Sequence, residues 1–225
     1  GSLSPWNTHL SSEEYEPDAW LVMLRKTKGS ALTSSELTTW QTSQMSKANA
    51  SLSRFFEFSR NTLDTTSTSD TQTTANPYHY GHVPEVTVNP DGTGSIKKHY
   101  CLGRISRELV QVMPDNKTVL MGDDYTGGAL FMFIANTAGD LSAGTLYVAK
   151  LTATLTSVDP AAPATGLSWV KLGHATSAEI KALVSGGIKA ADIMDVKTSD
   201  PSDASYTLMY FGGKKNWVKL KTGME

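Results

Sequence analysis

The chain has 225 residues, enough for one large domain or two small ones. Its 20 Lys and Arg residues nearly balance its 22 Asp and Glu residues, and the formal charge of −2 argues against a nucleic-acid partner. No stretch approaches the roughly 18 consecutive apolar residues of a membrane-spanning helix, so we expect no membrane partner. The single cysteine, Cys101, excludes a disulfide framework within the chain.

The first third of the chain predicts a helical insertion followed by an irregular one. Apolar residues recur at spacings of three and four between Leu37 and Leu52, after serines that can cap a helix, which predicts helical structure over 34–58. Residues 61–76 then contain nine Ser or Thr among sixteen positions. We expect 59–77 to be an irregular, mobile insertion.

From Tyr78 onward the pattern is that of antiparallel β structure. Alternating apolar runs are separated by turn residues, including an Asp-Gly pair that is a strong hairpin signal. The predicted strand pairs are 84–88 with 95–102, 109–113 with 118–121, and 129–135 with 145–151. Such spacing is typical of a sandwich, a barrel or a propeller, and without a clean internal repeat the residues alone leave all three open.

The last fifty residues predict a second helical insertion over 176–196 and one more strand. Ser177 can cap a helix that Gly186 and Gly187 would end, and 188–196 fits a further short helix. Tyr206 to Phe211 reads as a final strand.

Two pairs of adjacent carboxylates are candidates for a metal site. Glu13 and Glu14 follow a short strand, where successive side chains point to opposite faces, so only one of them can face a given site. Asp123 and Asp124 end the strand 118–121, a loop position where Ca²⁺ finds oxygen ligands. A solvated acidic turn explains the first pair as well, and Asp pairs also simply form turns.

Glu108 is a fifth candidate, because it lies at the entry to the apolar strand 109–113. Unpaired burial of a carboxylate is costly, so Glu108 is either held by a cation or exposed at the strand end. An ion pair with Arg104 or Arg107 is the simpler interpretation.

Other chemistry lacks support in the sequence. His79 and His82 have a ligand-like spacing, but no further Cys or His follows at an interval typical of zinc sites. No nucleophile elbow, phosphate-binding loop, dinucleotide fingerprint or zinc-protease motif is present. Catalytic side chains therefore stay unassigned.

Four segments, in order, resemble the PhoX-type alkaline phosphatase family. They are LSPWNTHLSSEE at 3–14, LGRISRE at 102–108, VLMGDD at 119–124 and LSAGTLYVAK at 141–150. The similarity continues loosely to 169–172 and fades in the last fifty residues.

The resemblance implies a six-bladed β-propeller that hydrolyses phosphate monoesters and is exported by the twin-arginine route, hence periplasmic or secreted. It implies a site with Ca²⁺ and Fe³⁺ held mostly by carboxylates and one cysteine. For this chain, the resemblance implies that the metal ligands are one or both members of each acidic pair, together with Glu108. The expected ligand set is Glu13, Glu14, Glu108, Asp123 and Asp124.

Family members are much longer, so we expect a mainly β chain that forms part of one propeller. The expected division of 1–225 is a helical and Thr-rich insertion at 31–77, β blades at 78–172, and a helical insertion with a final strand at 173–225. The exposed sheet edges of a partial ring would pair with the remaining blades or with another copy.

The chain departs from the family pattern at the expected metal centre. The family's cysteine ligand would lie just before Gly1, and Cys101 is not its counterpart. Ser12 stands where many relatives have Cys, and Arg107 stands where His is expected. We therefore expect an incomplete metal site and no activity from these residues alone.

Two other functions remain open. One is a calcium-dependent, lactonase-like propeller hydrolase in which one Ca²⁺ activates water. The other is a non-catalytic binding or structural module, which loss of the metal site would favour.

Overall fold

The computed structural model describes most of the β-rich part of the chain. The described residues are 1–14, 16, 17, 19, 33–35, 38, 76–124, 128–154, 157, 159, 161–211 and 214–224. The predicted helical region 34–58 and the predicted irregular insertion 59–77 lie almost wholly outside these residues.

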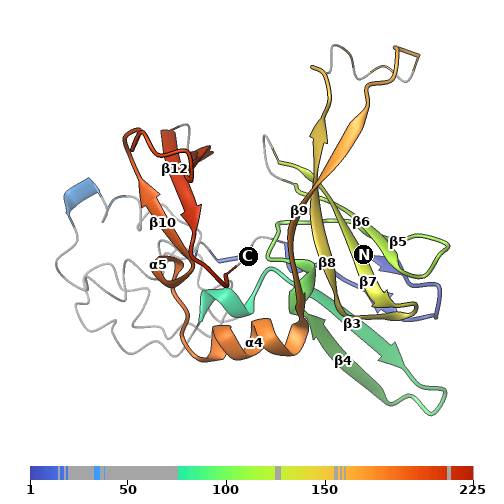
Figure 1. Ribbon diagram of the computed structural model, residues 1–225. Coiled ribbons are helices and arrows are strands. Elements are labelled where there is room, and N and C mark those ends of the chain that lie inside the picture. The colour runs from blue at the N-terminus through green and yellow to red at the C-terminus, as the bar shows by residue number, and fades with distance from the viewer. Residues whose placement is uncertain are drawn as a thin grey trace.

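Three antiparallel sheets make up the described part of the chain (Figure 1). The first has the order β1 (Ser2–Leu3), β2 (His9–Leu10), β3 (Val83–Val88), β4 (Gly94–His99). The second is a meander of β5 (Val110–Val112), β6 (Thr118–Gly122), β7 (Leu130–Thr137), β8 (Asp140–Leu151) and β9 (Leu167–Thr176). The third has the order β10 (Met194–Lys197), β12 (Lys214–Leu220), β11 (Thr207–Phe211).

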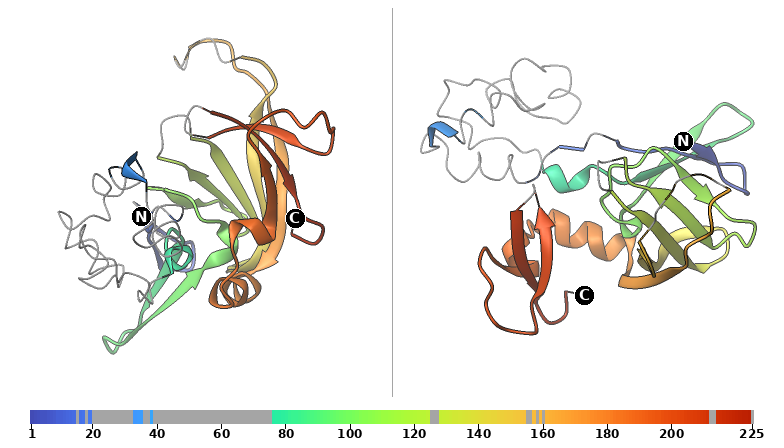
Figure 2. Two further views of the ribbon diagram at one scale, coloured as in Figure 1. Left: turned by 90° about the vertical axis from the view of Figure 1, so that its left-hand side faces the viewer. Right: turned by 90° about the horizontal axis from the view of Figure 1, so that it is seen from above.

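The helical elements are short. Two 3₁₀ turns, η5 (Pro77–His79) and η6 (Tyr100–Leu102), flank the β3–β4 hairpin. Two α-helices, α4 (Ser177–Ser185) and α5 (Ala190–Ile193), connect the second sheet to the third. Figures 1 and 2 show α4 between the second and third sheets. None of the described helices is long and apolar enough to cross a membrane.

All three predicted strand pairs are confirmed. Each pair is closed by a local turn, which is why the local sequence could predict it. In the first, β3 and β4 pair from Val83 opposite His99 to Val88 opposite Gly94, around a turn where Gly92 has a φ of 85°. The β5–β6 and β7–β8 pairs follow, with β8 starting earlier than predicted, directly after Gly139. The mainly β class is thus correct, and within the described residues the sheets stay open rather than closing into a barrel or ring.

The hydrophobic core lies between the first two sheets. Buried side chains alternate with exposed ones along β5, where Val110 and Val112 point inward and Gln111 outward. The remaining members from both sheets and η6 are Leu10, Val83, Cys101, Leu102, Val119, Met121, Phe133, Ala135 and Leu141. Burial of these apolar surfaces stabilises the contact between the two sheets.

Gly144 shows how tightly β7 and β8 pack. It pairs with Ala135, and a Cβ atom at this position would overlap the Ile134 carbonyl oxygen and the Phe133 ring. Glycine here allows a close approach that a side chain would prevent.

The second helical insertion differs in detail from its prediction. The N-cap is Thr176, whose hydroxyl accepts from the Glu179 amide at 3.1 Å while the Glu179 carboxylate accepts from the Thr176 amide at 2.7 Å. Ser177 was the expected cap, but its hydroxyl instead donates to the Cys101 sulfur at 3.2 Å. Only Ala190–Ile193 of the predicted 188–196 helix is helical, and β10 follows at once.

Candidate functional site

Glu13 and Glu14 lie on an extension of β2 that continues beside β3. The Ser11 amide donates to the Pro84 carbonyl at 2.9 Å, and the Glu13 amide donates to the His82 carbonyl at 3.3 Å. These bonds keep the register in which Leu10 faces Glu85. The segment is therefore extended, and successive side chains point to opposite sides.

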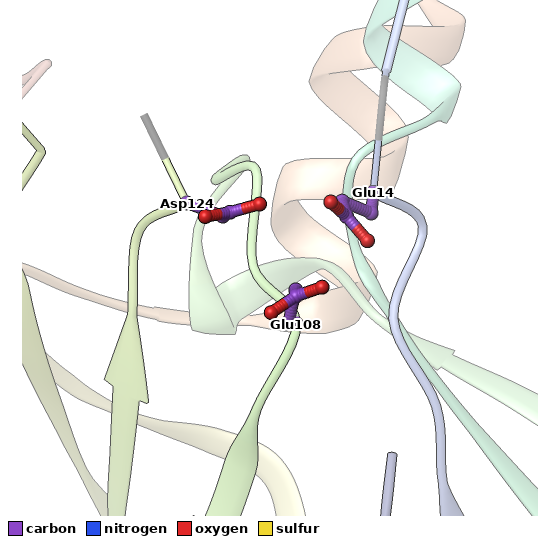
Figure 3. Close-up of side chains that lie close together, drawn as sticks. All are labelled: Glu14, Glu108 and Asp124. Carbon is purple, nitrogen blue, oxygen red and sulfur yellow. The ribbon is translucent and has the colours of Figure 1, made fainter. Parts of the chain in front are cut away.

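The two adjacent glutamates accordingly have different neighbours. The Glu13 carboxylate forms an ion pair with Lys98 at 2.6 Å and accepts from the His82 amide at 3.0 Å. Glu14 instead turns toward two carboxylates of the second sheet (Figure 3). The expectation that only one of the pair can face a given site agrees with this geometry.

Glu108 and Asp124 are placed by the pairing of β5 with β6. Glu108 lies shortly before β5 and Asp124 shortly after β6, and antiparallel neighbours bring those ends to the same edge of the sheet. The Asp124 amide donates to the Ser106 carbonyl at 2.6 Å, which continues the contact beyond the strands.

A hydrogen bond connects the segment bearing Glu14 to the segment bearing Glu108. The Ser12 hydroxyl donates to the Arg107 carbonyl oxygen. Ser12 precedes Glu14 by two residues and Arg107 immediately precedes Glu108. The bond therefore draws the two glutamates together although they are far apart in sequence.

The result is a cluster of Glu14, Glu108 and Asp124. One carboxylate oxygen from each lies within 4.8 Å of the others, with Glu14 partly buried and the other two exposed. Calcium–oxygen distances of about 2.3–2.6 Å allow two ligands of one ion to lie up to about 5.2 Å apart. The spacing therefore suits a single hard cation, and Ser11, Ser12 and Leu109 line the depression beside it.

Arg107 is buried beneath this region rather than paired with Glu108. Its side chain is fully buried, and its guanidinium donates to the Gly103 carbonyl at 2.7 Å and the Leu102 carbonyl at 3.2 Å. Burial lowers the pKa of Arg107 to about 10, against the opposing charges of nearby carboxylates. Arg107 therefore remains a cation at neutral pH.

Asp123 does not belong to the cluster. Its amide donates to the Ala129 carbonyl at 3.0 Å, and its carboxylate is partly buried. Burial raises the pKa of Asp123, while the charge of Arg107 opposes that shift. Asp123 therefore interacts electrostatically with Arg107, and its neighbour Asp124 joins the two glutamates.

Lys98 is a residue that the sequence reasoning did not single out. It lies on β4 beside Lys97, and the alternation of a strand was the only signal that the two lysines would face different surroundings. Lys97 forms an exposed pair with Asp140 at 3.4 Å, whereas Lys98 points inward to Glu13.

His82 introduces a pH dependence next to this region. Its Nε2 donates to the Tyr78 carbonyl at 2.9 Å, and its Nδ1 is buried without a hydrogen-bond partner among the described residues. Burial lowers the pKa of His82 from 6.5 to about 4, which the Tyr78 hydrogen bond opposes. The charges of Lys98, Arg107 and Arg104 lower it further.

We expect the free energy of unfolding to decrease as pH falls from about 6.5 to about 4. In this window the unfolded chain protonates His82 and the folded chain does not, so protons favour unfolding. Urea unfolding at pH 7 and pH 5 will measure the difference. His82→Gln should lose this component, whereas the exposed His174→Gln should keep it. Equal pH dependence in wild type and His82→Gln would contradict the assignment.

Fold and cluster together define a mainly β protein with a carboxylate-lined surface site. A family model described as Alkaline phosphatase PhoX matches residues 1–210, nearly the whole chain. The chain therefore belongs to the PhoX alkaline phosphatase family. No curated protein and no solved structure matches the chain.

Proposed function

We propose that the chain is part of a secreted, metal-dependent phosphomonoesterase in which Glu14, Glu108 and Asp124 hold Ca²⁺. The family membership supports the reaction class, and the convergence of the three carboxylates is the observation that carries the site. Hydrolysis of phosphate monoesters is the activity that an alkaline phosphatase family implies.

The donor set fits a hard cation. All three ligand atoms are carboxylate oxygens, which suit Ca²⁺ better than metals that prefer thiolate or imidazole. Cys101 is buried and donates to the Leu141 carbonyl at 3.2 Å, so it is placed as a core residue rather than as a ligand. The Fe³⁺ that the resemblance implies would need a cysteine ligand from outside the described residues.

A bound cation would supply charge neutralisation at the phosphoryl oxygens and polarisation of the attacking water. The chain's own residues have simpler tasks. Glu14, Glu108 and Asp124 supply negative charge at an accessible surface. The Ser12 hydroxyl fixes the separation of the two glutamates through the Arg107 carbonyl. Buried Arg107 supplies positive charge beside the cluster, where it interacts with the carboxylates of Glu16, Asp123 and Glu13.

The propeller belongs to the same proposal. Antiparallel sheets of four and five strands, with neighbouring strands in sequence order, are the kind of unit that a propeller repeats around its axis. Exposed apolar side chains on β9, among them Val170 and Leu172, would be covered by neighbouring blades or by a second copy.

Calcium titration followed by calorimetry is the direct test of the site. With three carboxylate ligands we expect a dissociation constant on the order of 10⁻⁴ M. Elemental analysis and assays of 4-nitrophenyl phosphate and a lactone, on a longer protein that contains the chain, then separate the functions. Phosphate release with calcium and iron bound supports the proposal. Lactone hydrolysis with one calcium, or no binding at millimolar calcium, would overturn it.

A further inference from the structure

Lys98 makes an unusually complete set of contacts for a lysine near the surface. Its Nζ lies 2.6 Å from a Glu13 carboxylate oxygen and donates to the His79 carbonyl at 2.7 Å. It also lies 5.1 Å from the centre of the Tyr80 ring, within reach of a cation–π contact. The side chain of Lys98 is 25% exposed and that of Glu13 is 14% exposed. An ion pair this enclosed is less screened by solvent than one on the open surface.

The partner of Lys98 is held on its other side as well. One Glu13 oxygen faces Lys98, and the other accepts from the His82 amide at 3.0 Å. Both oxygens are thus engaged, and the Glu13 backbone is bonded to the His82 carbonyl at 3.3 Å. This part of the β2 extension has a fixed orientation.

Fixing Glu13 also fixes Glu14. The two residues are adjacent in an extended segment, so their Cβ atoms leave the backbone on opposite sides, and contacts that hold the segment for Glu13 also restrain where Glu14 begins. The Lys98 and His82 contacts of the Glu13 carboxylate add to the single backbone bond that holds this segment beside His82, so without Lys98 the segment is held more loosely and the Glu14 carboxylate moves away from Glu108 and Asp124.

We propose that Lys98 is a positioning residue for the metal site, which acts through Glu13 to hold Glu14 in the cluster. This inference rests on the proposed function, because it assumes that the cluster binds a cation. The contacts of Lys98 described above are with Glu13, His79 and Tyr80, which lie outside the proposed ligand set. The role of Lys98 is to hold the segment in which the strand register has already turned Glu14 toward the cluster.

The proposal and simple electrostatics predict opposite changes in Ca²⁺ affinity when the charge of Lys98 is removed. Removing a positive charge near an acidic site should strengthen cation binding if charge alone matters. Loss of a positioning contact should instead weaken it, since partners outside the ligand shell typically contribute a factor of about 10–100 in metal affinity.

The experiment measures Ca²⁺ affinity by calorimetry in wild type, Lys98→Met, Lys98→Arg and Lys97→Met. Lys97→Met is a matched control, because it removes the same charge from the neighbouring position on β4 and breaks only an exposed pair. We expect Lys98→Met to bind Ca²⁺ at least about tenfold more weakly, and Lys98→Arg to recover much of the loss. Lys97→Met should bind as tightly as wild type or slightly more tightly.

Tb³⁺ luminescence gives a second readout that a general loss of stability would not produce. Tb³⁺ replaces Ca²⁺ at oxygen sites, and its decay times in H₂O and D₂O count the bound waters. If Glu14 leaves the ion in Lys98→Met, we expect about one additional bound water at saturating Tb³⁺. Urea unfolding of each variant shows whether it is folded under the binding conditions.

The outcomes separate the two hypotheses. If wild type does not bind Ca²⁺, the proposed metal site itself fails. If wild type binds and Lys98→Met binds equally well or better with the same water count, only the positioning role of Lys98 is wrong. Weaker binding in Lys98→Met with unchanged binding in Lys97→Met supports it. Should Lys98→Met not fold, Lys98→Gln compared with Lys97→Gln gives the same test, because each variant again removes one positive charge from adjacent positions on β4.

Discussion

Glu108→Gln is expected to abolish calcium binding and leave the fold intact. Glu108 contributes one of three carboxylates within 4.8 Å of one another, and the amide of Gln keeps the shape but loses the charge. Because Glu108 is exposed and its side chain is outside the core, the free energy of unfolding should change by less than about 0.5 kcal/mol. Calorimetric titration with Ca²⁺ and urea unfolding measure the two properties.

Asp195→Asn is a suitable control for this variant. Asp195 is an exposed carboxylate on β10, in the third sheet, and it pairs with Lys221 at 3.9 Å. Asp195→Asn removes the same charge from outside the cluster, so calcium binding should persist in this variant. Unchanged calcium affinity in Glu108→Gln would exclude Glu108 as a ligand, and equal losses in both variants would show a nonspecific effect of net charge.

Phe133→Ala is expected to cause the largest loss of stability among these variants. Phe133 lies at the centre of β7, its side chain is fully buried, and it packs against Gly144 of β8. Truncating a buried Phe removes apolar contacts and leaves a cavity, which costs about 3–5 kcal/mol. Urea unfolding, monitored by tryptophan fluorescence, measures the change in free energy.

Ile134→Ala provides the comparison, because the next residue on β7 points to the other face and is 36% exposed. We expect it to cost less than about 1.5 kcal/mol. Similar losses in the two variants would mean that the core does not lie between the first two sheets. If Phe133→Ala does not fold, Phe133→Leu takes its place, because it leaves a smaller cavity. We expect Phe133→Leu to be no more stable than Ile134→Ala.

Local signals predicted much of the β structure correctly. The β3–β4 and β5–β6 hairpins are closed by short turns, so residues near each other in sequence determine their pairing. Strands β9, β10 and β12 were not predicted as separate strands, and β10 overlaps the predicted helix 188–196, because exposed lysines and polar residues interrupt their apolar pattern. Helix α4 was found, but its cap was assigned one residue late.

That error has a tertiary cause. Thr176 and Ser177 both carry a hydroxyl, and either can cap a helix. The Ser177 hydroxyl contacts Cys101, which is 76 residues away in sequence, so Thr176 forms the capping box with Glu179. Nothing in the local sequence distinguishes the two hydroxyls.

For the candidate site, too, the sequence determined one part of the answer and the tertiary structure another. The sequence by itself, through its acidic pairs and its four family-like segments, determined which five carboxylates deserved consideration. Only the tertiary structure brought Glu14, Glu108 and Asp124 together and left Glu13 with Lys98. The physical reason is that this choice depends on the register of β2 against β3 and of β5 against β6, and on a Ser12 hydrogen bond across 95 residues. A shift of one residue in either register would exchange the side chains that face the cluster, and no local pattern encodes pairing over that distance.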